Sequence, residues 1–294
     1  MSAPMTDIAA PRARAPRGSA GWVLRQLARK RAARIGGAVL LVLVVCALFG
    51  PWIVPYDPFR VDAVNRLQPP SLTHFFGTDE LGRDIFSRIV IGCRYFLVIS
   101  LTAAAIAISL GVPMGLLAGA GPAWVDAVVM RVVDVLLAFP YILLVLAVIA
   151  ILGPSLNTAM VAVGVAGVPG YARLVRGEVL SVRQSEYVEA MRALGASWSR
   201  ITFRTILPNV MSSIIIYASY ATPLAVLAAA ALSFLGLGAQ PPLPEWGAML
   251  VNARTFMRTA WWTVAAPGLA IFVSILALNL LGNALRDVLD PRSK

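Results

Sequence analysis

The sequence predicts an all-α protein that crosses a membrane several times, and two observations carry this prediction. Hydrophobic residues make up 59% of the 294 residues and charged residues only 13%, and the mean hydropathy is +0.79. A soluble domain of this size would need far more polar surface. The charged residues are also clustered, which leaves five long stretches without any charged side chain.

These stretches predict six transmembrane helices, because one helix needs about 20 apolar residues. The stretches run from Arg34 to Asp57, Arg94 to Asp126, Asp134 to Arg173, Arg204 to Glu245 and Arg258 to Arg286. The third has room for two helices, Leu136–Leu152 and Leu156–Val175, separated by the turn signal Gly153-Pro154. The fourth holds one helix, at about residues 210–235, and each of the others also holds one.

The predicted organisation is a basic tail (1–34), a first helix (35–55), a loop (56–94) and a five-helix core (95–290) that contains a polar segment at 177–208. The apolar stretch after Arg34 continues to about Pro55 without a cleavage site of small residues, so it predicts a permanent helix and not a signal peptide. Residues 1–20, rich in Pro, Ala and Arg, predict a disordered tail.

Arginine and lysine fall mainly on one side of the predicted membrane. With an even number of helices both ends of the chain share a side, and Arg131 and the polar segment 177–208 lie there too. The positive-inside rule places this side in the cytoplasm of a cell membrane and the loop 56–94 outside. The net charge of +11 sits in clusters beside apolar runs, which predicts contact with membrane lipid and no binding of nucleic acid.

Several kinds of chemistry are excluded. The predicted helices lack the charged residues on which ion-coupled carriers depend. A phosphate-binding loop needs a lysine after glycine, and neither Lys30 nor Lys294 follows one. Cys46 and Cys93 have no neighbours that suggest a metal site or a disulfide. We therefore expect a non-enzymatic chain without metal or cofactor, whose nucleotide energy, if any, comes from a partner.

The polar segment carries two turn signals. Leu180, Tyr187, Met191 and Leu194 recur at helical spacing and predict one apolar stripe. Gly195 is placed to end a helix in the left-handed conformation, and Ser197 to cap a short second helix that runs to about residue 205 and stops before Pro208. Two interpretations fit this pattern equally well, an ordinary interfacial loop and a docking surface for a soluble protein.

The same segment resembles the EAA motif of ABC importer permeases, a coupling loop that docks into a groove on the ATPase subunit. The matching residues are Glu189, Ala190, Gly195, Leu207 and Pro208. Two positions depart from the pattern. Met191 replaces the second alanine, and Ile206 is adjacent to Leu-Pro instead of one residue away.

A second motif precedes the second predicted helix. The residues Gly77, Thr78, Asp79, Gly82, Arg83 and Asp84 resemble the GTDxxGRD signature of the dipeptide and oligopeptide branch of these permeases, in its C-type subunit. Asp79 with Arg83 and Asp84 with Arg88 are spaced i,i+4, which favours a short surface helix. Further matches near Trp246 and Asn279 extend the resemblance over most of the chain.

The resemblance implies a type I importer fold and a role as one half of a translocation pathway. A B-type permease would supply the other half, two ATPases would bind ATP and Mg, and an extracytoplasmic solute-binding protein would deliver the substrate. Peptides are the expected cargo, while nickel chelates, glutathione or oligosaccharides remain open. A self-contained channel and an intramembrane enzyme are less favoured, and no residue is assigned to substrate binding.

Overall fold

The computed structural model describes residues 20–289, and the tail predicted to be disordered lies almost wholly outside this range. Apart from one isolated antiparallel bridge between Thr78 and Asp84, the regular structure of the described part is helical. The helices are α1 (Ala20–Arg29), α2 (Arg31–Ile53), α3 (Ile85–Ala120), α4 (Ala123–Ala138), α5 (Tyr141–Leu152), α6 (Leu156–Arg183), α7 (Glu186–Ala193), α8 (Trp198–Ile201), α9 (Leu207–Phe234), α10 (Trp246–Ala253) and α11 (Trp262–Leu289).

In the described part of the chain, five helical stretches are long and apolar enough to cross a membrane. They are α2, α3, α6, the continuous stretch from α8 to α9, and α11. The third of the six predicted helices, Leu136–Leu152, is not one helix. The chain bends by 95° between α4 and α5 at Phe139 and Pro140, because Pro140 has no N–H to continue the hydrogen-bond ladder. Residues 20–289 therefore contain five candidate spans, or six if the bent pair crosses the membrane as a unit.

Helix α3 begins ten residues earlier than the charge pattern indicates. The carboxylate of Asp84 caps it by accepting a hydrogen bond from the backbone N–H of Ser87 at 2.8 Å, and the helix runs for 36 residues. Arg88 is buried in its first turns. A paired arginine can lie inside a helix end, so the last charge before an apolar stretch does not mark where the helix begins.

The centre of the fold is the contact between α3 and α6. Gly111, Gly115 and Gly119 form one stripe on α3, and a Cβ on any of them would collide with α6, at Tyr171, Val175 and Val179 respectively. Small residues at every fourth position let two helix backbones approach closely inside a membrane. This stripe holds α3 and α6 together.

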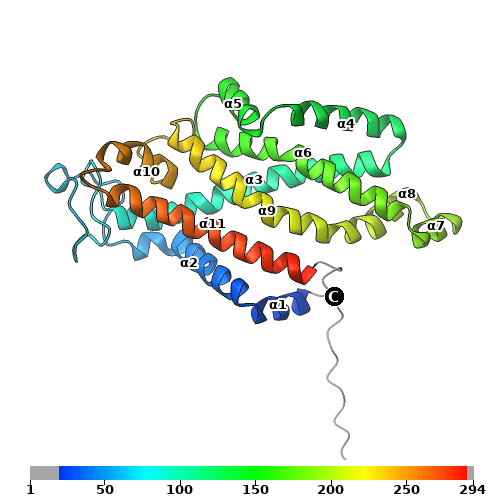
Figure 1. Cartoon of the computed structure of the whole chain (residues 1–294), viewed down its shortest axis with the longest axis horizontal. Coiled ribbons are helices and arrows are strands. Elements are labelled where there is room, and N and C mark those ends of the chain that lie inside the picture. The colour runs from blue at the N-terminus through cyan, green and yellow to red at the C-terminus, as the bar shows by residue number, and fades with distance from the viewer. Residues whose placement is uncertain (1–19, 290–294) are drawn as a thin grey trace, which may run out of the picture.

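The molecule is elongated and has two distinct ends (Figure 1). The loops before α3 and the short helix α10 lie at one end, and α7 and α8 lie at the other. Both ends of the described chain lie in the half of the molecule that contains α7 (Figure 1), and Lys30 forms a 2.7 Å ion pair with Asp287 of α11. The pair α4–α5 runs along the outside of α6 back toward the α10 end (Figure 1).

Candidate functional site

The polar segment 177–208 forms a projection at one end of the bundle (Figure 1). Helix α7 contains Glu189 and Ala190, both exposed. It ends in a Schellman motif, in which the N–H of Gly195 donates to the carbonyl of Arg192 at 2.9 Å and the N–H of Ala196 to that of Met191 at 3.0 Å. Gly195 has φ of +80°. The left-handed turn predicted at this glycine is confirmed.

The chain after the turn differs from the prediction. Ser197 occupies the N-cap position of α8, although its side chain forms no capping hydrogen bond. A π-helical turn, Thr202–Ile206, then joins α8 to α9 without a break. Pro208 does not stop a helix as expected. It lies in the first turn of α9. A proline has no backbone N–H to donate, and the wider π-helical turn before it changes the hydrogen-bond pattern so that no donor is required at this position.

The projection is anchored on the bundle through Trp198 and three apolar side chains. The guanidinium carbons of Arg183 and Arg192 lie 5.2 Å and 4.9 Å from the centre of the Trp198 ring. Arg183 also donates to the carbonyl of Gly119 at the end of α3 at 3.3 Å. The side chains of Val188, Ile201 and Ile206 are fully buried in the cluster formed by α3, α6 and α9. The projection therefore has to move with the ends of α3, α6 and α9 that it contacts.

The outer surface of the projection has no cover in the described structure. Glu189 is exposed and forms no ion pair with any described residue. Leu194 is 87% exposed and Phe203 is 61% exposed. The predicted apolar stripe is wrong in part, since Tyr187 and Leu194 face outward and the buried residue of α7 is Val188. Leu207 is half-buried and Pro208 exposed, so four of the five EAA-like residues remain accessible.

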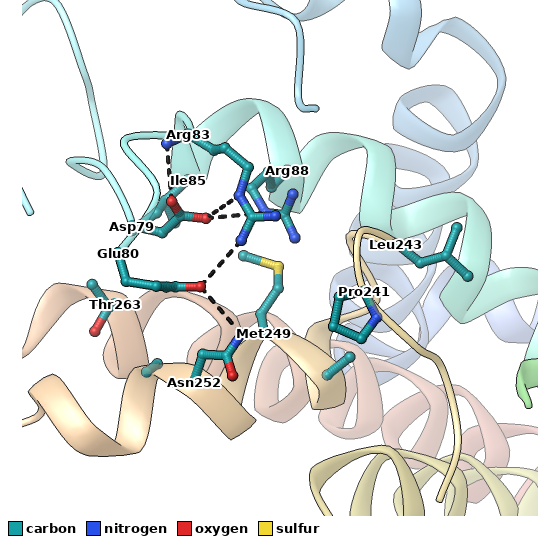
Figure 2. A pocket seen from close by; sticks show the side chains of 12 residues that line it. Asp79, Glu80, Arg83, Ile85, Arg88, Pro241, Leu243, Met249, Asn252 and Thr263 are labelled. Carbon is teal, nitrogen blue, oxygen red and sulfur yellow. Dashed lines mark hydrogen bonds and ion pairs between the residues drawn. The ribbon is translucent and has the colours of Figure 1, made fainter. Parts of the chain in front are cut away.

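The second motif is a buried charge cluster at the opposite end of the molecule. Figure 2 shows Asp79, Glu80 and Arg83 converging beside Asn252 of α10. The Arg83 Nε donates to Asp79 Oδ2 at 2.7 Å and its Nη2 to Glu80 Oε1 at 3.2 Å. Asn252 donates to the same Glu80 oxygen at 3.2 Å. Arg88 lies 3.6 Å from Asp79 Oδ2 and donates to the carbonyl of Pro58 at 2.9 Å.

The remaining motif residues fold the loop onto α3. Thr78 is fully buried, and its hydroxyl accepts from the N–H of Gln68 at 2.8 Å. Gly77 and Gly82 adopt positive φ, which a residue with a side chain would resist. Asp84 binds the Nδ1 of His74 at 2.9 Å in addition to capping α3.

The prediction of a short surface helix at this motif is therefore wrong. Residues 79–84 form a turn, and Asp84 pairs with His74 and not with Arg88. The i,i+4 spacing predicted one contact correctly, between Asp79 and Arg83. The cavity between these side chains has a volume of about 20 Å³, too small for an organic solute. The motif is a structural clamp between the loop, α3 and α10.

Glu245 is a buried carboxylate to which the sequence assigned no role. Both of its oxygens accept backbone hydrogen bonds at the start of α10, from Gly247 at 3.0 Å and Ala248 at 2.8 Å. Burial raises the pKa of this carboxyl, and the two backbone N–H groups partly oppose the rise. An acidic residue directly before a short helix is a capping signal that could have identified it.

The fold and the uncovered projection define a multi-pass membrane component that works with other subunits. Residues 111–294 match the family described as binding-protein-dependent transport system inner membrane component. The chain belongs to this family. Residues 22–70 match the N-terminal transmembrane domain of oligopeptide transport permease C. Membership makes this chain a non-catalytic permease of an ABC transporter in which no cofactor is expected, and it implies ATPase and binding-protein partners.

Several curated relatives are similar over nearly the whole chain. The di/tripeptide transport system permease protein DppC of Pseudomonas aeruginosa (strain UCBPP-PA14) is 45% identical over 267 residues, which cover 88% of each chain. The dipeptide transport system permease protein DppC of Alkalihalophilus pseudofirmus is 44% identical and covers 92% of this chain and 89% of the relative. The glutathione transport system permease protein GsiD of Pectobacterium atrosepticum is 45% identical, with 92% and 90% covered.

Among solved structures, a chain of the inward-facing MetNI methionine ABC transporter has the same core fold. The TM-score is 0.56 at 21% sequence identity, and the match covers 69% of this chain and 97% of that chain. At this identity the likeness concerns the fold alone. It supports the expected ABC importer permease architecture.

Proposed function

We propose that this chain is the C-type permease subunit of a peptide importer. It would form half of the translocation pathway, and a B-type permease would form the other half. Two ATPases would bind at the α7 end, on the cytoplasmic side together with both chain termini, and a solute-binding protein would deliver substrate at the α10 end.

The observation that carries this proposal is the uncovered projection formed by α7 and α8. Its outer surface combines an unpaired carboxylate, Glu189, with exposed apolar side chains, Leu194 and Phe203. Such a mixture is typical of a surface that docks on another protein. Its inner surface is packed on α3, α6 and α9, so a push from an ATPase would reach the helices that line the pathway.

Peptides are the proposed cargo because two of the similar permeases are named for di- or tripeptides. The chain shares the GTDxxGRD segment typical of that branch. Glutathione is the second candidate, since the GsiD relative has the same level of identity. Glutathione is itself a tripeptide, so both cargoes carry amide groups and terminal charges.

Purification of the chain from its native membrane in mild detergent tests the proposal. Recovery of a second permease and of ATPases with it, with ATP hydrolysis stimulated by a peptide-loaded binding protein, is the expected result. Recovery of the chain alone, under conditions that preserve other membrane complexes, would contradict it. Conductance by the purified chain would then favour a channel.

A further inference from the structure

A cavity of about 570 Å³ lies between α3, α5, α6 and α9. It borders the middle of α3 at Ala103 and Ala107 and the middle of α6 at Ala166 and Gly170. Most of its lining is alanine, glycine, valine or leucine, and none of the lining residues is acidic or basic. The exceptions to this apolar lining are Thr222 and four tyrosines, Tyr141, Tyr171, Tyr217 and Tyr220.

The hydroxyl of Tyr171 has no hydrogen-bond partner among the described residues. The residue is 1% exposed, and an unpaired hydroxyl in such a place is unfavourable unless a partner arrives. Its ring is fixed by the edge-on ring of Tyr217, with 4.7 Å between the centroids. Tyr217 in turn lies 6.5 Å from the ring of Tyr220. The three rings form a connected aromatic wall that carries hydroxyl groups.

A second observation comes from the break between α4 and α5. Leu137 and Tyr141, on the two sides of the break, both line the cavity, and the Tyr141 hydroxyl reaches the carbonyl of Val163 at 3.4 Å. Inside a membrane, backbone that leaves a helix is tolerated only where protein buries it or where it borders a water-filled cavity. Since Leu137 and Tyr141 both border the cavity, the break lies directly beside it.

We propose that this cavity binds the main chain of a peptide in transit, with the hydroxyls of Tyr171 and Tyr217 hydrogen-bonded to its amide groups. The inference rests on the proposed function as a peptide permease. The chemistry matches because a phenol both donates and accepts, as a peptide unit requires. The rings provide an apolar surface for varied side chains. The absence of acidic or basic lining residues means that the peptide's terminal charges are not held, which suits brief passage.

Two other occupants would use the cavity differently. A lipid acyl chain has no group to pair with the Tyr171 hydroxyl. A helix of the second permease would fill the space through apolar packing, and removing one hydroxyl would then leave packing intact. Both alternatives predict that tyrosine-to-phenylalanine changes leave transport unaltered.

The test uses the complete transporter, purified with its partner subunits and reconstituted in proteoliposomes. We compare three variants with wild type: Tyr171→Phe, Tyr217→Phe and the double variant. The measured quantity is uptake of radiolabelled trialanine at a saturating concentration of peptide-loaded binding protein. ATP hydrolysis is measured in the same vesicles. Tyr95→Phe is the matched control, because Tyr95 lies on α3 outside this cavity.

Each single variant should lower trialanine uptake per ATP hydrolysed about fivefold, the effect of one hydrogen bond, and the double variant should lower it further. Subunit yield and thermal stability should not fall, because the Tyr171 hydroxyl has no partner to lose. Unchanged uptake per ATP in the double variant would overturn the inference, with or without a change in stability. Failure of the assembled wild type to import trialanine would overturn the proposed peptide function itself.

Discussion

The two ends of this molecule use similar residues in opposite ways. At the α7 end, Glu189 is exposed and unpaired within the described residues, beside exposed Leu194. At the α10 end, Asp79 and Arg83 are each about 95% buried and bound to one another. Charges that stay exposed next to apolar side chains are available to a partner, whereas charges paired inside the protein stabilise its own fold. The comparison separates a docking surface from a clamp.

Charge reversal at Glu189 should give the largest effect on transport. We expect Glu189 to pair with a basic residue in the ATPase groove, because it is a charge on the exposed surface of the motif, and Glu189→Arg would place a like charge against that residue. Such a mismatch costs several kcal/mol, so peptide uptake should fall by more than about tenfold. ATP hydrolysis by the ATPases should become uncoupled from uptake. Uptake and ATP hydrolysis in proteoliposomes measure this.

The matched change is Glu186→Arg, one turn earlier on α7 and outside the motif. It makes the same change of charge and should reduce uptake much less. Full uptake by Glu189→Arg would remove the role assigned to this residue, and equal losses in both variants would mean that net charge alone matters.

Removal of the Asp79 charge should give the largest effect on stability. Asp79→Asn leaves Arg83 and Arg88 buried without their shared carboxylate, and breaking a buried pair in this way costs about 3–5 kcal/mol. The thermal midpoint of the purified complex should fall markedly. Asp57→Asn, at an exposed position in the same loop, should change it little. A midpoint for Asp79→Asn equal to that of wild type would show that the cluster is not a clamp.

Glu245 should make stability depend on pH at the α10 end. Its pKa is raised in the folded protein by burial, so its contribution is fully present below the ordinary pKa of a glutamate and is lost as the pH rises through the folded value. Wild-type stability should therefore decrease over this window, and Glu245→Gln should remove that component. Thermal midpoints at a series of pH values measure the difference. Identical pH profiles for both proteins would contradict the prediction.

Gly195→Ala should give the smallest effect. An alanine in the left-handed conformation costs about 1–2 kcal/mol, and the cost falls on the turn that orients α7. ATPase binding by the purified permease pair should weaken modestly, by about tenfold. Gly177→Ala, inside α6 with open space around it, should be neutral or slightly stabilising. If only the Gly177 variant bound the ATPases more weakly, the role assigned to the turn at Gly195 would be wrong.

The sequence predicted the turn at Gly195 and the pair of Asp79 with Arg83, because both depend on residues at most five positions apart. It did not predict the buried turn at 79–84, since the contacts that hold this turn and the flanking Thr78 and Arg88 come from distant residues: Asn252, Trp262 and Pro58. Likewise, Leu194 fits an apolar stripe by spacing, yet it faces outward because the bundle packs against Val188 instead. Helical spacing shows which residues share a face, and the neighbours decide which face is buried.

By itself the sequence determined that this chain is a multi-pass helical membrane protein with an EAA-like segment, because hydrophobic stretches and short motifs are local properties. Only the tertiary structure decided that α4 and α5 are two helices bent at Pro140, that Pro208 continues a helix, and that four tyrosines from α5, α6 and α9 meet in one cavity. The cavity joins residues far apart in the chain, and the course of a helix at a proline depends on what packs around it. Both depend on how closely helices pack, which the glycine stripe of α3 permits and which no single segment specifies.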